Sequence, residues 1–268
     1  LNSNNMLRKI YSLPSSFFIR IFLFAMTKLW IDMETKRLGS NYGGWNFIDK
    51  PYLKNTTIIS AGCGEDVSFD IEFMNYYDSN AIFIDPTPRS IDHLDKIIKN
   101  LGNDKLLDYK KGGNQPISTY NLKNIDLSRF KIVKKALFNK DNFNIKFYPP
   151  LNPDHVSYSI SNWQSQSKLS NNFIEVETVT IKKILEDYKI QDLKILKMDI
   201  EGAENQVLPY LLKNKIFPEQ ILVEFDELHT KKLIPYIKAS IIIFKLIKNN
   251  YKLIKTPKFP DMLFLKNE

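Results

Sequence analysis

From residue 56 onward, short apolar runs alternate with segments whose apolar positions recur every three or four residues. The runs predict buried strands and the periodic segments predict helices. The predicted strands are Thr57–Ala61, Ala81–Asp85, Lys131–Leu137, Ile195–Asp199, Ile221–Phe225, Tyr251–Lys255 and Met262–Leu265. The predicted helices are Phe69–Tyr77, Ser90–Leu101, Thr180–Tyr188, Ala203–Leu212 and Lys231–Asn249. This alternation predicts a doubly wound α/β fold, with a mostly parallel sheet of seven strands and helices on both faces.

Two polar segments interrupt the pattern. Residues 112–127 and 148–172 are rich in turn-forming residues, so we expect loops there rather than linkers to a second domain. A chain of 268 residues is short for two full domains. The sequence therefore predicts an N-terminal helical extension over residues 1–50 and a single α/β domain over residues 51–268.

The N-terminal segment Leu13–Ile31 is densely apolar, but Arg20 and Lys28 interrupt it. It lacks both the uninterrupted length of a membrane span and the small-residue cleavage site of a secretory signal. Two interpretations stay open. The helix packs on the protein's own core or a partner, or it lies in a membrane interface with its two basic residues near the lipid headgroups.

The net charge of +8 and the pI of about 9.2 raise the question of a nucleic-acid partner. The excess is nearly all lysine, spread over every segment, whereas a phosphate-binding surface needs clustered charge. We therefore expect no nucleic-acid partner. The single cysteine, Cys63, excludes an intrachain disulfide and a cysteine-rich zinc site, so a reducing compartment and a cytoplasmic location are expected.

The first candidate site is a glycine turn directly after an apolar strand, in the string Ser60-Ala61-Gly62-Cys63-Gly64-Glu65-Asp66. The next strand ends in Asp85, where α/β nucleotide sites place an acid for the ribose hydroxyls. Alone, the turn could be an ordinary strand-to-helix connection. The third glycine of a dinucleotide site is missing, and carboxylates beside the turn would repel a pyrophosphate. A cofactor that carries a cationic sulfonium suits the turn better than NAD does.

Two further strands end in acids. Asp199 and Glu201 follow one strand and could serve only to cap the next helix. Glu224 ends another apolar strand, and His229 follows it in the loop. Because the carboxyl ends of parallel strands form the ligand crevice of an open sheet, these side chains are candidates for catalysis.

Four strings together resemble the FkbM family of methyltransferases over about residues 36–230. They are Gly43-Gly44-Trp45, the glycine turn, Asp85-Pro86-Thr87-Pro88-Arg89 and Met198-Asp199-Ile200-Glu201-Gly202-Ala203-Glu204. The resemblance implies a class I methyltransferase fold of Rossmann-like type, S-adenosylmethionine as donor, and O-methylation of a sugar or polyketide hydroxyl. Ser60 stands where methyltransferases commonly have an acid, so the partner of the donor's amino group stays open.

On this resemblance, the residues expected to bind the cofactor are Ala61, Gly62, Cys63, Gly64, Glu65, Asp66, Asp85, Pro86, Ala136, Leu137 and Asp199. The expected catalytic residues are Asp199, Glu224 and His229, which would align the acceptor hydroxyl and remove its proton. Substrate binding is expected from His155, Ser157 and Glu201.

We assign no metal, although the acids at neighbouring strand ends could alternatively hold a divalent cation. The expected partner is a small-molecule or glycan acceptor, lipid-linked acceptors included, with residues 13–31 as the candidate membrane contact at the inner face. The competing functions are an NAD-linked oxidoreductase and a non-catalytic module at a membrane surface. Neither the fold class nor the loops identify the acceptor.

Overall fold

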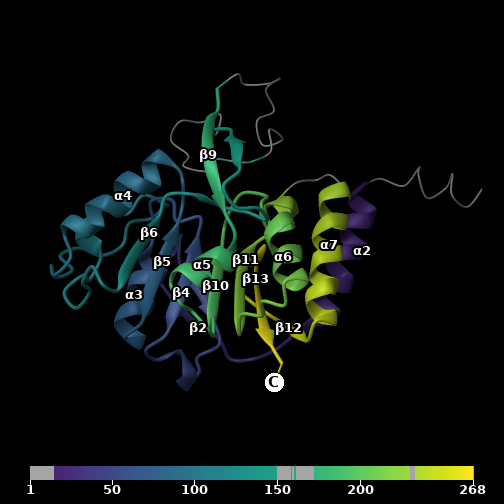
Figure 1. Cartoon of the computed structure of the whole chain (residues 1–268). Coiled ribbons are helices and arrows are strands. Elements are labelled where there is room, and N and C mark those ends of the chain that lie inside the picture. The colour runs from purple at the N-terminus through teal and green to yellow at the C-terminus, as the bar shows by residue number, and fades with distance from the viewer. Residues whose placement is uncertain (1–14, 150–157, 159, 161–171, 230–232, 268) are drawn as a thin grey trace, which may run out of the picture.

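The computed structural model describes residues 15–149, 158, 160, 172–229 and 233–267 of the chain. These residues form a mixed α/β fold with six α-helices and a large central sheet (Figure 1). In spatial order the strands of this sheet are β1 (Trp30–Ile31), β12 (Tyr251–Ile254), β13 (Asp261–Lys266), β11 (Gln220–Glu224), β10 (Ile195–Met198), β4 (Thr57–Ala61), β5 (Asn80–Ile84) and β6 (Phe130–Val133). Pairing is parallel except at β13, which is antiparallel to both of its neighbours.

Two details of the predicted sheet were wrong. The sheet has eight strands among the described residues, because β1 pairs in parallel with β12 at the edge. The predicted strand Lys131–Leu137 is divided between two sheets: β6 ends at Val133, and β7 (Ala136–Leu137) pairs with β9 (Ile174–Val179). Between the two strands, Lys134 and Lys135 form ion pairs with Asp95 and Glu177. The chain therefore leaves the central sheet at two charged residues that have partners outside it.

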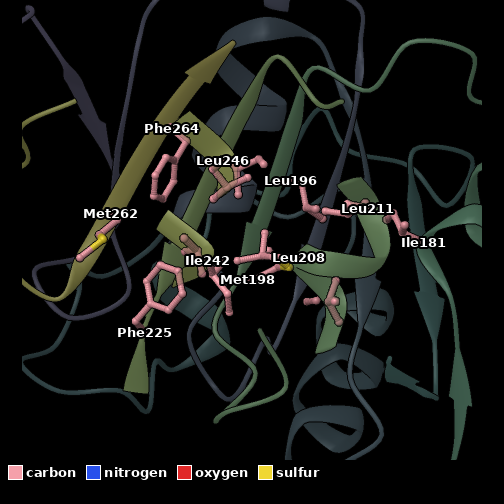
Figure 2. Packing of buried hydrophobic residues seen from close by; sticks show 14 of the residues in the cluster. Ile181, Leu196, Met198, Leu208, Leu211, Phe225, Ile242, Leu246, Met262 and Phe264 are labelled. Carbon is pink, nitrogen blue, oxygen red and sulfur yellow. The ribbon is translucent and has the colours of Figure 1, made fainter. Parts of the chain in front are cut away.

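Successive side chains of the strands point to opposite faces of the sheet and pack into two separate cores. One core lies between the sheet and the helices α2 (Ser15–Leu29), α5 (Ile181–Asp187), α6 (Glu204–Lys213) and α7 (Leu233–Lys248). Figure 2 shows the part of it in which Leu196 and Met198 meet Leu208, Leu211 and Ile242. The other core lies under α3 (Ser68–Tyr77), α4 (Pro88–Lys99) and the hairpin β2 (Lys36–Leu38)–β3 (Trp45–Phe47). Helices therefore cover both faces, as predicted.

A second, three-stranded sheet has the order β7-β9-β8, where β8 is Asn144–Phe147. In Figure 1, β9 rises above the central sheet. Strands β8 and β9 were not predicted, although Ile174 and Val176 alternate with Glu175 and Glu177, a pattern typical of a strand with one solvated face. Most of the predicted loop 148–172 lies outside the described residues.

The N-terminal helix α2 packs against α7 on the same face of the sheet (Figure 1). Met26 is buried in the first core, and the rings of Phe22 and Tyr236 meet edge to face with centroids 5.2 Å apart. The inner side of the segment thus packs on the protein's own core, one of the two interpretations of the sequence. No helix in the described part of the chain is long and apolar enough to cross a membrane. The division of the chain at residue 50 stays a prediction.

Candidate active site at the carboxyl ends of the parallel strands

The glycine turn leaves β4 between the ends of its two neighbours, β5 and β10. The backbone amide of Gly62 donates to Ile84 O at 3.0 Å, and that of Asp199 donates to Ala61 O at 3.0 Å. Gly62 has φ +74°, and a Cβ there would lie 1.7 Å from the backbone oxygen of Asp199. Glycine is therefore required at position 62 by the end of β10 as well as by the turn itself.

Asp85 follows β5 and holds the turn in shape. Its Oδ2 accepts hydrogen bonds from the backbone amides of Cys63 at 2.8 Å and Gly64 at 3.2 Å. Its Oδ1 accepts from the backbone amide and the hydroxyl of Thr87, at 2.8 and 2.7 Å. The predicted ribose acid thus lies beside the predicted cofactor turn, and both of its oxygens already accept bonds from the protein.

The two acids after the turn have partners of their own. Glu65 forms a forked ion pair with Arg89 at the start of α4, with distances of 2.6 and 3.3 Å. Asp66 is buried and accepts from the Ser40 hydroxyl at 2.6 Å and the Ser68 amide at 3.0 Å. Arg89 offsets the charge of Glu65, which weakens the argument that these carboxylates exclude a pyrophosphate. Through these two hydrogen bonds, Asp66 connects the loop after β2 to the start of α3.

The string from Asp199 to Glu204 forms a tight turn between β10 and α6. Glu201 and Gly202 both have positive φ, +53° and +98°. The fully buried Glu204 carboxylate accepts the backbone amides of Ile200 and Gly202, both at 2.8 Å. Helix α6 has Ala203 at its N-cap without a side-chain bond. Asp199 is therefore not the cap of this helix, and Glu204, to which the sequence analysis gave no role, shapes the turn.

Asp199 lies in an acidic environment at the end of β10. Burial, followed by the charges of Glu224, Glu201 and Glu204, raises its pKa well above the ordinary value. Tyr42, from the turn between β2 and β3, lies close enough to the same carboxylates that its own pKa is raised, first by burial and then by Asp199 and Glu224. The structure thus brings the predicted acids together, and it adds a tyrosine that the sequence gave no reason to place there.

The next strand end carries a histidine–glutamate pair. His229 Nε2 lies 2.8 Å from Glu224 Oε1, and the pair follows directly from β11 through the short helix η3 (Asp226–His229). The Glu224 side chain is largely buried, whereas that of His229 is 55% exposed, so the imidazole is accessible from solvent. Two of the three predicted catalytic residues are therefore in direct contact.

Asp261 joins this pair from the antiparallel strand β13, where it is the direct cross-strand neighbour of Glu224. It is 7% exposed, its Oδ2 pairs with Lys258 at 3.1 Å, and its Oδ1 has no hydrogen-bond partner among the described residues. Burial, with a contribution from Glu224, raises its pKa from 3.8 to about 6, against the opposing charge of Lys258. Asp261 was not among the predicted site residues, because β13 lies far along the chain from every motif.

A buried ion pair lies beneath the turn. Lys197 Nζ contacts Ser60 Oγ at 3.0 Å and Asp70 Oδ2 at 3.3 Å, and both charged residues are almost fully buried. Burial raises the pKa of Asp70, and the charge of Lys197 opposes this shift. Ser60, the residue that departs from the common methyltransferase pattern, thus binds this lysine.

Other predicted residues stand as follows. Ala136 and Leu137 are buried on β7, and Pro86 is partly exposed beside Asp85. His155 and Ser157 lie outside the described residues, so their predicted substrate contacts stay predictions. Within the described ranges, no group of three or more His, Cys, Asp or Glu side chains is arranged to hold a metal ion.

Comparison with known protein families gives one match. The family model described as Methyltransferase FkbM domain matches residues 48–253, which is most of the chain. No curated protein matches the chain, and no solved structure does. The matched range contains the glycine turn, Asp85, Asp199 and the Glu224–His229 pair, whereas Tyr42 and Asp261 lie outside it.

Proposed function

The chain belongs to the FkbM methyltransferase domain family and is thus a methyltransferase, and we propose that it moves a methyl group from S-adenosylmethionine to a hydroxyl of a glycan, sugar or related natural product. The observation that carries the proposal is the contact of His229 with Glu224 beside Asp199, at the edge where the glycine turn lies. Open α/β sheets bind their ligands at this edge.

The described residues fit the proposed donor. Its nucleoside part would be held by the turn at Gly62–Gly64 and by Asp85, and its amino-acid part would face Asp199. Positive φ at both glycines keeps the turn tight, and Asp85 fixes the two amides that follow Gly62. When bound, the sulfonium supplies an already activated methyl group, so the protein has to align an acceptor and remove one proton.

The Glu224–His229 pair can remove that proton. When Glu224 accepts from Nε2–H, Nδ1 is the ring nitrogen that can accept a proton. The exposed His229 ring can take a proton from a hydroxyl brought to the strand ends, and the resulting imidazolium is stabilised by the glutamate. Asp199, and Tyr42 whose pKa it helps to raise, would hydrogen-bond to the acceptor and orient it.

The proposed site is tested with Glu224→Gln, His229→Asn and Asp199→Asn, measured by single-turnover methyl transfer and by calorimetric binding of S-adenosylmethionine. The first two variants should keep their melting temperature and donor affinity while the rate falls about 10²-fold or more. Asp199→Asn should lower the rate by a similar factor. Full activity in all three folded variants contradicts the assignment.

The donor itself needs a separate measurement. Asp85→Ala removes the acceptor of the Cys63 and Gly64 amides, so donor affinity should fall by roughly 1.5 to 3 kcal/mol. Binding of NAD with no binding of S-adenosylmethionine refutes the donor and favours the oxidoreductase alternative. We place the reaction in the cytoplasm, a location that the free thiol of the one cysteine, Cys63, supports.

A further inference from the structure

The two helices α2 and α7 are apolar on their outer sides as well as on their buried sides. Large apolar side chains point to solvent from both, and they reach 66% exposure at Phe24 and 69% at Ile234. The exposed apolar residues are Phe17, Ile21 and Phe24 on α2 and Ile234, Ile237, Ile241 and Phe244 on α7. They are spaced three or four residues apart, so each set forms one row along its helix.

The two rows belong to a single surface. On α2 the row lies opposite the buried Met26, and on α7 it lies opposite the buried Ala239 and Ile243. The helices pack side by side in the layer that covers one face of the sheet (Figure 1). Because the inner side of each helix faces the sheet, both rows face away from it. We call this surface the outer face of α2 and α7.

The charges on this face have one sign. Arg20 and Lys28 on α2 and Lys238, Lys245 and Lys248 on α7 are all exposed. Neither helix contains an aspartate or a glutamate. Lys28 lies over the ring of Phe24, with its Nζ 5.4 Å from the centroid, so charge and apolar surface are mixed. Large apolar side chains interleaved with basic residues only are typical of a helix that lies in a lipid interface.

We propose that the outer face of α2 and α7 binds the surface of an anionic lipid membrane, with the exposed phenylalanines and isoleucines in the acyl boundary and the lysines at the headgroups. Negative headgroups complement the basic residues of this face, and acyl chains complement the apolar rows. A nucleic acid would satisfy the charges but leave the aliphatic rows against phosphates. The proposed attachment is peripheral, and within the described ranges no helix is long and apolar enough to cross a bilayer.

The position of this face also indicates which class of acceptor the enzyme uses, an inference that rests on the proposed function. Helix α7 follows closely after η3, which carries His229, and Tyr236 Oη donates to Leu228 O at 2.8 Å. The start of α7 is therefore fixed to the segment that bears the proposed base. A protein attached through α7 holds its active site close to the membrane, where a lipid-linked acceptor would be reached.

The experiment is cosedimentation of the full chain with phosphatidylcholine vesicles, with and without phosphatidylglycerol. We expect binding to the anionic vesicles and a loss of binding as salt increases. Two double variants test the apolar and the electrostatic contributions to vesicle binding separately. Phe24→Ser with Phe244→Ser, and Lys28→Glu with Lys245→Glu, should each lower the partition coefficient about tenfold or more. These side chains are exposed, so both variants should keep the wild-type melting temperature.

Matched controls lie elsewhere on the protein. Leu106→Ser removes a side chain that is 78% exposed, and Lys99→Glu reverses a charge on α4, across the sheet from α2 and α7; both should bind vesicles like wild type. Equal binding to neutral and anionic vesicles, or wild-type binding by the double variants, overturns the proposal. So does a dimer at sedimentation equilibrium that the same variants dissociate, with no vesicle binding. None of these outcomes depends on methyl transfer, so a failed activity assay leaves this test intact.

Discussion

Replacing Asp261 by Asn should stabilise the protein at neutral pH, although it removes an ion pair. Burial and the neighbouring Glu224 raise the pKa of Asp261 from 3.8 to about 6, despite Lys258 3.1 Å away. A carboxyl whose pKa is higher in the folded state binds its proton more tightly there. The free energy of unfolding therefore falls as the pH rises from the unfolded value through the folded one.

The size of the effect follows from the shift. About two pKa units at 1.36 kcal/mol each give roughly 3 kcal/mol of lost stability above about pH 6. Asn resembles the protonated acid in shape and charge, so Asp261→Asn should recover much of this at about pH 8 and almost none at about pH 3. The opposing effect of Lys258 is already included in the raised pKa, so the loss of this ion pair does not reverse the sign.

The assay is urea unfolding of wild type and variant across this pH range. Asp49→Asn is a control of opposite sign, because hydrogen bonding by Tyr77, together with Lys36, lowers the pKa of Asp49 against the effect of burial. That variant should lose stability at neutral pH and not in acid. If Asp261→Asn is less stable than wild type at about pH 8, or if the difference does not change with pH, the reasoning is refuted.

The remaining predictions concern the two turns. Gly62→Ala should destabilise the protein by more than about 3 kcal/mol in urea unfolding, since its Cβ would lie 1.7 Å from a backbone oxygen. Gly102→Ala is the control, because Gly102 has φ +88° but no atom within 4 Å of the added Cβ, and it should cost only about 1 to 2 kcal/mol. Glu204→Gln leaves one acceptor for two backbone amides and should cost about 1 to 3 kcal/mol while also slowing methyl transfer; an unchanged melting temperature counts against its role in the turn.

The ends of strands were predictable wherever an apolar run is followed directly in the sequence by a candidate site residue. The apolar runs before Gly62, Asp85, Asp199 and Glu224 end within one residue of the predicted ends. Parallel pairing then places all four at one edge, because neighbouring parallel strands have their carboxyl ends together. Local periodicity and one general property of sheets were sufficient for this part of the site.

The missed residues reach the site through pairing that local sequence does not encode. Asp261 faces Glu224 only because β13 returns antiparallel between β11 and β12 in a particular register. Tyr42 comes from a segment whose position depends on the bond from Ser40 to Asp66. Such contacts depend on registers and loop paths, and a one-residue slip of β13 would turn Asp261 to the opposite face of the sheet.

The balance of charge at the strand ends bears on the choice of cofactor. Sequence reasoning placed the relevant negative charge on Glu65 and Asp66, but Arg89 neutralises the first and the second is buried against Ser40. Three other acids, Glu224, Glu201 and Glu204, lie instead around Asp199, whose pKa is raised by burial and by these carboxylate neighbours. Such crowding costs folding free energy that a bound cation would offset. The site therefore favours a ligand that carries positive charge, which supports a sulfonium donor over a pyrophosphate-containing one.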